Sequence, residues 1–345
     1  MDRKSTVSAE PSGASDLAHI VLSFDNNDHA RALFGQFDEN LKLIEATLGV
    51  DVRSRGNQVS IKGEPVATEQ ARRAIDHLYD QLHEGGDDPE KSDVEGALRM
   101  AIAADDQLDL PTIENKAKIA AAQIATRKKT IFARTPNQDA YMRALERAEL
   151  VFGVGPAGTG KTYIAVAHAA MLLERGQVER IILSRPAVEA GERLGFLPGD
   201  MKEKVDPYLR PLYDALYDMI PGDKVERALA AGVIEIAPLA FMRGRTLSNA
   251  AIILDEAQNT TTMQMKMFLT RLGENARMMV TGDPSQVDLP HGQKSGLVDA
   301  LQVLDNVDGI IKVRFKDTDV VRHPLVAKIV SAYDKTYAPR ADDTR

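Results

Sequence analysis

A glycine-rich stretch near the middle of the chain constrains its fold more than any other feature. Residues 155–162 read GPAGTGKT, which matches the pattern G-x-x-x-x-G-K-[ST] at every fixed position. An apolar run precedes it at residues 150–154, and a helical pattern follows at residues 162–174. A turn of this kind between a buried strand and a helix points backbone N–H groups inward, beside the positive end of the helix dipole. The sequence therefore predicts a phosphate-binding loop rather than a chance glycine-rich turn.

The residue types within this loop predict a role for each part of it. Lys161 is expected to bridge the β- and γ-phosphates of a nucleoside triphosphate, and the Thr162 hydroxyl is expected to ligate Mg²⁺. The expected ligands are ATP and Mg²⁺. The residues predicted to bind the nucleotide here are Gly155, Pro156, Ala157, Gly158, Thr159, Gly160, Lys161 and Thr162.

A second motif follows, where an apolar run ends in two carboxylates. Residues 251–254 read AIIL, and Asp255 and Glu256 come directly after them. Ligands of open parallel sheets bind outside the carboxyl ends of the strands, so both acids are placed to reach the phosphates. Asp255 is expected to hold Mg²⁺, and Glu256 to act as the general base toward water. An Asp-Glu pair alone would more often mark a solvated loop, but its position after a phosphate loop favours the catalytic interpretation.

The order of apolar and helical segments predicts two folded parts. From residue 139 onward, short apolar runs alternate with helical patterns, which indicates a mostly parallel α/β sheet with helices on both faces. Earlier, residues 17–83 predict the order β–α–α–β–β–α, a small α+β module. The boundaries that we predict are a disordered leader at 1–16, the module at 17–83, a linker and basic connecting segment at 84–134, the ATPase domain at 135–337 and a polar tail at 338–345.

Composition excludes several other classes of protein. The 345 residues include no cysteine, so disulfide frameworks, cysteine zinc sites and thiol nucleophiles are excluded. No apolar run is long enough to span a bilayer, and the N-terminus lacks a secretory signal, so a cytoplasmic protein without membrane contact is expected. The net charge of −8 argues against a surface that binds nucleic acid throughout.

One basic stretch stands out in this acidic chain. Residues 115–137 carry six basic side chains and no acidic one: Lys116, Lys118, Arg127, Lys128, Lys129 and Arg134. Such a segment can be a solvated face, or it can be a track that contacts the phosphates of a nucleic acid. The sequence leaves both interpretations open, with slightly more weight on the first.

Further motifs give the chain a specific resemblance. They are TPNQ at 135–138, SRPAVEAGERLGFLPGD at 184–200, DEAQ at 255–258 and GDPSQ at 282–286. TPNQ, the phosphate loop, DEAQ and GDPSQ in this order resemble the first RecA-like ATPase domain of superfamily 1 helicases. With the motif at 184–200 included, the chain from about residue 16 to 337 closely resembles the PhoH-like family of P-loop ATPases. The resemblance implies that Gln138 contacts adenine, that Gln286 senses the γ-phosphate, and that Arg185 lies near the phosphates or a nucleic-acid track.

The same resemblance implies a KH-like fold for the N-terminal module, with one departure. KH modules that bind RNA clamp its backbone with a G-x-x-G loop between two helices. Residues 34–38 read FGQFD, which lacks the second glycine and adds an acid. An assembly or docking role is therefore the alternative to RNA binding for this module.

Chain length bears on oligomeric state. Superfamily 1 helicases complete their site with arginines from a second ATPase-like domain, and this chain has room for only one such domain. We therefore expect a homo-oligomer with ATP at each subunit interface, and the family resemblance implies a hexameric ring. Arg314 and Arg322 are the candidate arginines, although Arg322 can instead pair with Asp319.

Three functions remain compatible with these motifs. The first is an ATPase that acts on single-stranded RNA, which DEAQ and GDPSQ favour. The second is an ATP-dependent regulatory or assembly protein whose N-terminal module binds a protein. The third, a small-molecule kinase, ranks last because those motifs are typical of hydrolases that couple hydrolysis to motion.

Overall fold

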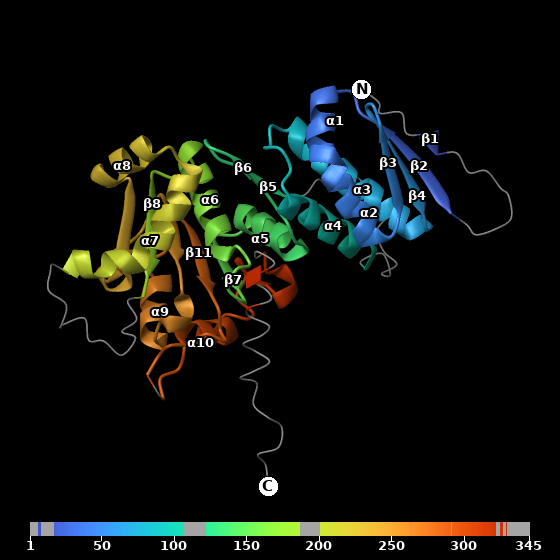
Figure 1. Ribbon diagram of the computed structural model, residues 1–345. Coiled ribbons are helices and arrows are strands. Elements are labelled where there is room, and N and C mark those ends of the chain that lie inside the picture. Colours follow the sequence, from blue (N-terminus) through green and yellow to red (C-terminus); the bar gives the residue numbers. More distant parts are fainter. Residues whose placement is uncertain are drawn as a thin grey trace, which may run out of the picture.

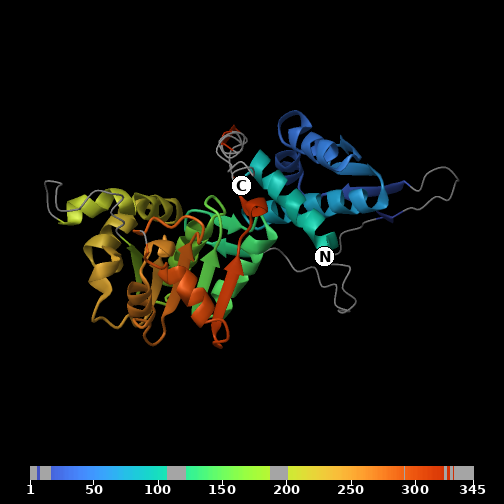
Figure 2. The ribbon, with the colours of Figure 1, turned by 90° about the horizontal axis from the view of Figure 1, so that it is seen from below.

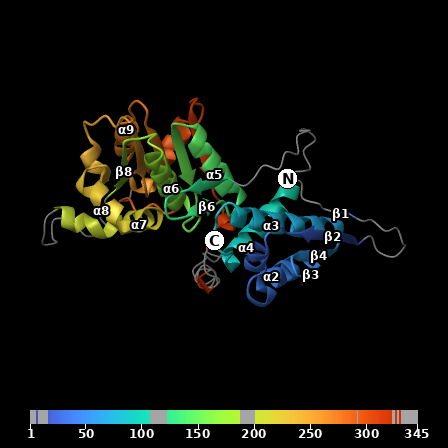
Figure 3. The same ribbon diagram turned by 90° about the horizontal axis from the view of Figure 1, so that it is seen from above.

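A computed structural model of the chain describes residues 6–7, 17–106, 122–186, 201–290, 292–321, 325–326 and 329, with the side chains of 6–7, 105–106 and 201–208 excepted. These residues form an N-terminal module and a larger α/β domain, which is the predicted ATPase domain (Figure 1). Views from below and from above show the two parts lying side by side (Figures 2 and 3).

The N-terminal module is a four-stranded antiparallel sheet covered by helices. Its elements follow the predicted order: β2 (Ala18–Ser23), α1 (Asn27–Phe34), α2 (Glu39–Leu48), β3 (Asp51–Arg55), β4 (Gln58–Gly63) and α3 (Pro65–His83). The sheet order is β1-β2-β4-β3. Strand β1 (Thr6–Val7) lies inside the predicted disordered leader, and it pairs with β2 because that edge offers free backbone groups.

A further helix completes the core of this module. Helix α4 (Lys91–Asp106) lies within residues 84–134, which the sequence predicts to connect the two folded parts. Its residues Val94, Ala97, Leu98 and Ala101 are buried in the same core as α1 to α3. Their spacing places one apolar stripe on the helix, which the module covers. We therefore propose that the module extends to Asp106, beyond the predicted boundary at residue 83.

The ATPase domain is built on a six-stranded sheet in which all pairings are parallel. Its strands are β7 (Leu150–Val154), β8 (Arg180–Arg185), β9 (Ile234–Pro238), β10 (Ala250–Leu254), β11 (Arg277–Gly282) and β12 (Ile310–Arg314). Their order in the sheet is β12-β7-β11-β10-β8-β9.

Helices cover both faces of this sheet, as the sequence predicts. Alternate strand residues point to opposite sides, so Ile253 packs with α5 (Pro136–Arg147), α6 (Lys161–Glu174), α7 (Met201–Met219) and α8 (Gly222–Ala230). Its neighbours Ile252 and Leu254 pack with α9 (Thr262–Leu269) and α10 (Gly296–Val303) on the other face. The domain therefore has three layers, with a hydrophobic core on each side of the sheet.

Strand order decides where the motifs meet. Strand β11 pairs with both β7 and β10, so it separates the phosphate-loop strand from the strand that carries the acids. All three strands are parallel, so residues 155–162, 255–256 and 283–286 follow at one edge of the sheet. A short hairpin of β5 (Gln123–Ala125) and β6 (Thr130–Phe132) leads into α5. Among the described residues, no helix has both the length and the apolar character needed to cross a membrane.

Candidate nucleotide-binding site

The phosphate loop has backbone angles that require glycine. Gly155 has φ of +142°, and a Cβ there would lie 2.5 Å from the carbonyl oxygen of Phe315. Gly158 and Gly160 both have φ of +82°. These values lie where side chains are strongly disfavoured, so the three glycines let the loop wrap before α6 begins at Lys161. The predicted strand–loop–helix arrangement is confirmed.

Lys161 lies at the centre of this loop. Its Nζ donates hydrogen bonds to the carbonyl oxygens of Gly155 (2.7 Å) and Pro156 (2.6 Å). Burial of the side chain lowers the pKa of Lys161, while the nearby carboxylates of Asp283, Glu256 and Asp255 act in the opposite direction. The ammonium group is thus placed where phosphate oxygens can replace the carbonyl oxygens as acceptors.

Asp255 is almost fully buried directly after β10, and its carboxylate accepts hydrogen bonds from two hydroxyl groups. Thr162 Oγ1 donates to Asp255 Oδ1 at 2.6 Å, and Thr281 Oγ1 donates to the same oxygen at 2.8 Å. Magnesium takes hard oxygen ligands, usually one or two carboxylates with phosphates and water. The pair of Thr162 and Asp255 oxygens fits such an ion, because both lie beside the phosphate loop.

Glu256 follows in a left-handed backbone conformation, with φ of 51° and ψ of 39°. Gln258 Nε2 donates to its Oε2 at 2.5 Å, and Arg185 Nη2 lies 3.4 Å from Oε1. Arg185 Nη1 also lies 3.8 Å from Asp255 Oδ2. The Glu256 side chain is 37% exposed, so its carboxylate is oriented by two neighbours and remains accessible to water.

The residues after β11 link this acid to the predicted γ-phosphate sensor. Gln258 Oε1 accepts a hydrogen bond from the backbone N–H of Asp283 at 3.0 Å. Asp283 in turn holds Gln286, whose Nε2 donates to Asp283 Oδ2 at 2.8 Å. Glu256, Gln258, Asp283 and Gln286 therefore form one hydrogen-bonded series along the edge of the sheet.

Gln138 is buried behind the phosphate loop. Its Oε1 accepts from the backbone N–H of Arg134 at 2.8 Å, and its Nε2 donates to the carbonyl oxygen of Thr159 at 3.0 Å. The side chain therefore joins the start of α5 to the loop. Contact with adenine, which the resemblance implies for Gln138, stays a prediction.

Two predicted features fall outside the described residues. Arg322 is one, although the residue before it is described: Val321 donates its N–H to the carbonyl oxygen of Gly158 at 3.0 Å. Most of the motif at 184–200 is the other, with only residues 184–186 described. Asp319, the alternative partner of Arg322, accepts hydrogen bonds from Asn137 Nδ2 and from the Lys316 N–H, each at 2.7 Å.

The described part of the basic segment is held by intramolecular contacts. Arg127 pairs with Glu174 at 2.8 Å, and Lys128 Nζ donates to the carbonyl oxygen of Tyr217 at 2.6 Å. The two remaining side chains also pair with acids, Lys129 with Asp218 at 3.1 Å and Arg134 with Asp93 at 2.7 Å. These contacts favour the interpretation of residues 127–134 as a protein surface rather than as a track for nucleic-acid phosphates. Lys116 and Lys118 lie outside the described residues.

The loop between α1 and α2 differs from a phosphate clamp. Phe37 is 90% exposed with φ of 52°, and Asp38 follows with φ of 59°. The Asp38 carboxylate accepts a hydrogen bond from Ser54 Oγ at 2.9 Å, which fixes an acid at this loop. An RNA backbone would meet negative charge there.

Sequence comparison relates the chain to one protein family. Residues 130–334 match the family described as PhoH-like protein. The chain belongs to that family. A "PhoH-like protein" of Bacillus subtilis (strain 168) is 51% identical over 310 residues, covering 90% of this chain and 95% of the relative. A "PhoH-like protein" of Mycobacterium bovis (strain ATCC BAA-935 / AF2122/97) is 47% identical over 342 residues, covering 98% of this chain and 95% of the relative.

Solved structures are similar only at a low level. The large terminase from a thermophilic bacteriophage aligns with a TM-score of 0.35 and 12% identity, over 56% of this chain and 46% of the terminase. That similarity is too low to support an argument. The P-loop fold of the ATPase domain rests instead on the strand order and loop geometry given above.

Sequence reasoning missed Thr281, which contributes the second hydroxyl group to Asp255. The residue is fully buried at the end of an apolar run, directly before Gly282 and Asp283. A hydroxyl side chain at the carboxyl end of a buried strand was the available signal. Its partner was not evident, because the contact depends on β11 lying beside β10.

Proposed function

We propose that this protein binds ATP with Mg²⁺ and hydrolyses it at the edge of the parallel sheet. The observation that carries the proposal is the 2.6 Å hydrogen bond between Thr162 and Asp255. It joins the end of the phosphate loop to the acid that precedes Glu256. The residues proposed to bind phosphate, to bind Mg²⁺ and to activate water therefore lie close together.

Each residue then has a distinct task in the reaction. Lys161 contacts the β- and γ-phosphates after leaving the loop carbonyls. Thr162 and Asp255 would hold Mg²⁺, which when bound would neutralise charge on the phosphates. Glu256, oriented by Gln258 and Arg185, accepts a proton from the attacking water.

Gln286 would contact the γ-phosphate of bound ATP. Its amide is held by Asp283, which is joined to Gln258 and so to Glu256. Loss of the γ-phosphate therefore changes a series of contacts that includes the general base. This gives hydrolysis a route to the rest of the chain.

We further propose that hydrolysis drives binding or remodelling of single-stranded RNA by a hexameric ring. Support comes from the presence of a single six-stranded sheet among the described residues, since the second domain of a helicase has no counterpart there. A neighbouring subunit would then complete each site, with Arg322 as the candidate arginine.

The second candidate function is an ATPase that acts on a protein partner without unwinding nucleic acid. Two observations favour it: the intramolecular pairing of Arg127, Lys128, Lys129 and Arg134, and the acid at the loop between α1 and α2. In that case the N-terminal module would bind the partner.

Steady-state ATP hydrolysis with Mg²⁺, measured with and without single-stranded RNA on a sample of known oligomeric state, separates these functions. The RNA proposal predicts a severalfold rise in turnover in a hexamer, and a large loss in Arg322→Ala that leaves the hexamer intact. Turnover that is unchanged by RNA supports the second candidate. A hexamer without turnover contradicts the proposed hydrolysis itself.

A further inference from the structure

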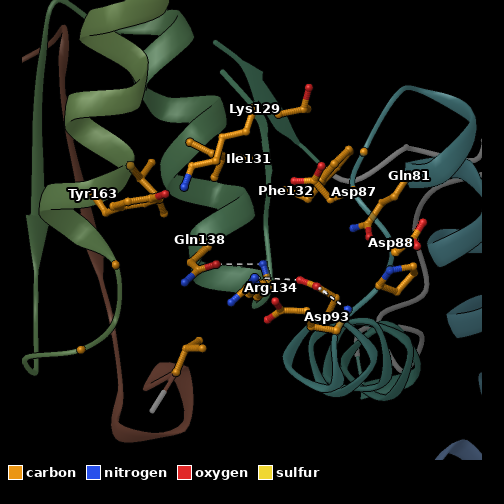
Figure 4. A pocket seen from close by; sticks show the side chains of 18 residues that line it. Gln81, Asp87, Asp88, Asp93, Lys129, Ile131, Phe132, Arg134, Gln138 and Tyr163 are labelled. Carbon is orange, nitrogen blue, oxygen red and sulfur yellow. Dashed lines mark hydrogen bonds and ion pairs between the residues drawn. The ribbon is translucent and has the colours of Figure 1, made fainter. Parts of the chain in front are cut away.

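A cavity lies between the ATPase domain and the N-terminal module, beside the phosphate loop. Its volume is about 450 Å³, which is within the usual range for small-molecule sites. One wall comes from Gly158, Gly160 and Tyr163, at the outer side of the loop and the first turn of α6. The opposite wall comes from residues 86–90, between α3 and α4 (Figure 4). The cavity thus adjoins the proposed triphosphate site, and both parts of the chain line it.

The two walls are joined by a series of contacts that starts at the loop. Thr159 accepts from Gln138, and Gln138 accepts from the N–H of Arg134. The Arg134 side chain pairs with Asp93 of α4 at 2.7 Å. Gly96 lies so close that a Cβ there would be 3.1 Å from Arg134 Cβ. A change at the loop is therefore coupled to α4, whose apolar face belongs to the core of the N-terminal module.

The chemistry of the walls suits the nucleoside end of a nucleotide. Tyr163 and Phe132 present aromatic rings, and Lys129 Nζ lies 5.2 Å from the Tyr163 ring centroid. Asp87 and Asp88 on the facing wall offer carboxylate oxygens, which accept hydrogen bonds from a base amino group or from ribose hydroxyl groups. The same carboxylates repel phosphates, so only one orientation of a nucleotide is favoured, with its phosphates toward Lys161.

We propose that the base and ribose of bound ATP enter this cavity and contact residues 86–90, so that nucleotide binding holds the N-terminal module against the ATPase domain. The inference rests on the proposed function for the position of the triphosphate. It adds that the module responds to the nucleoside and not only to the phosphates.

Hydrogen exchange of the backbone amides tests this inference with two ligands. Mg²⁺ with inorganic tripolyphosphate supplies the phosphates alone, and Mg-ATP supplies the nucleoside as well; Glu256→Gln is used so that ATP persists. Both ligands are expected to slow exchange at residues 155–162. Only ATP is expected to slow exchange at residues 84–93, by severalfold. Equal exchange at 84–93 with the two ligands overturns the inference, whereas no protection of 155–162 by either overturns the proposed function together with it.

Substitutions of Asp87 and Asp88 give an independent readout. Asp87→Asn combined with Asp88→Asn should raise KM for ATP about 3- to 10-fold, since the charged carboxylate acceptors are replaced by neutral amide oxygens, which form weaker hydrogen bonds with the nucleoside. The turnover number and the affinity for tripolyphosphate should stay within about twofold. The matched control is Glu39→Gln combined with Glu146→Gln, which makes the same charge change at exposed positions outside the cavity and outside residues 84–93. A KM that falls would show only the relief of charge repulsion, and that result or an unchanged KM would overturn the inference.

Discussion

At the scale of single residues, Asp255, the acid proposed to bind Mg²⁺, depends on a neighbour that has no contact with phosphate in the proposed site. Thr281 and Thr162 donate to the same oxygen of Asp255, so the orientation of the carboxylate is fixed from two sides. Groups that orient a metal ligand in this way commonly change metal affinity 10- to 100-fold when they are removed. Thr281 is therefore a positioning residue rather than a ligand.

Thr281→Val tests that role, because it keeps the shape of the side chain and removes its hydroxyl group. We expect the Mg²⁺ concentration for half-maximal hydrolysis to rise about 10-fold, with a loss of about 1 kcal/mol in stability. Titration of Mg²⁺ at saturating ATP measures the shift. Thr270→Val, an exposed threonine in the same domain, is the control. An unchanged Mg²⁺ requirement in Thr281→Val would show that Asp255 needs no second hydroxyl group.

His168 makes the stability of the ATPase domain depend on pH. Burial in α6, together with Arg277 and Arg175, lowers the pKa of His168 from 6.5 to about 4. Between these two values the unfolded chain binds a proton that the folded chain does not, so stability falls as pH falls from about 6.5 toward 4. From pH 7 to pH 5 this contribution is about 2 kcal/mol.

His168→Leu should remove that part of the pH dependence. We expect the difference in unfolding free energy between pH 7 and pH 5 to shrink by about 2 kcal/mol relative to the wild type. Denaturant unfolding followed by circular dichroism at both pH values is the measurement. Met171→Leu, a buried and non-ionisable position on the same helix, controls for a change in packing. An equal pH dependence in His168→Leu and the wild type would contradict the assignment.

At the scale of elements, β7 and α5 are in close contact because β7 contains a glycine. A Cβ on Gly153 would lie 2.8 Å from two ring carbons of Tyr141. Tyr141 is fully buried and packs edge-on against Phe315, with ring centroids 5.6 Å apart. The ring therefore has little room to move, and Phe315 is also the residue that approaches Gly155 of the phosphate loop.

Gly153→Ala should destabilise the ATPase domain by about 1–3 kcal/mol, as expected for an overpacked core. Thermal unfolding measured by calorimetry should show a lower midpoint. Gly222→Ala is the matched control, because its Cβ would meet only the Tyr217 ring at an ordinary 3.7 Å. A midpoint for Gly153→Ala equal to that of the control would show that Tyr141 moves freely.

Local sequence patterns predicted the strands of the sheet but not how the contacts between them form the site. The strands are evident because apolar runs such as residues 150–154 end in turn or acidic residues. The order that places β11 between β7 and β10 depends on long-range pairing, which leaves no local pattern. The hydrogen bonds that join Thr159, Gln138 and Arg134 could not be predicted for the same reason. The packing of helix α4 into the N-terminal module was not predictable either, because the core that covers it lies earlier in the chain.

At the scale of the whole molecule, the charge distribution bears on the choice between RNA and protein partners. The chain has a net charge of −8, and its basic residues 127–134 are held by partners within the chain. Phosphate contacts would require these contacts to break. Affinity for RNA, where it exists, should therefore arise elsewhere.

Arg127→Gln combined with Lys128→Gln should leave the affinity for single-stranded RNA, and its dependence on salt, within about twofold of the wild type. Each lost phosphate contact would instead lower the slope of log affinity against log salt by about 0.7. Fluorescence anisotropy with a labelled RNA at several salt concentrations measures both quantities. A shallower slope in the variant would show that these residues contact RNA phosphates.

In the proposed reaction Glu256 activates water, whereas nucleotide binding at the site does not require it. The most direct test compares single-turnover ATP hydrolysis and ATP binding in the wild type, in Glu256→Gln and in Glu274→Gln. Glu274 is exposed at the opposite edge of the sheet and gives the same change in charge. We predict that Glu256→Gln binds ATP as the wild type does and hydrolyses it about 10²–10⁴ times more slowly, while Glu274→Gln matches the wild type. Hydrolysis by Glu256→Gln at the rate of the wild type would contradict the role of Glu256 as the general base.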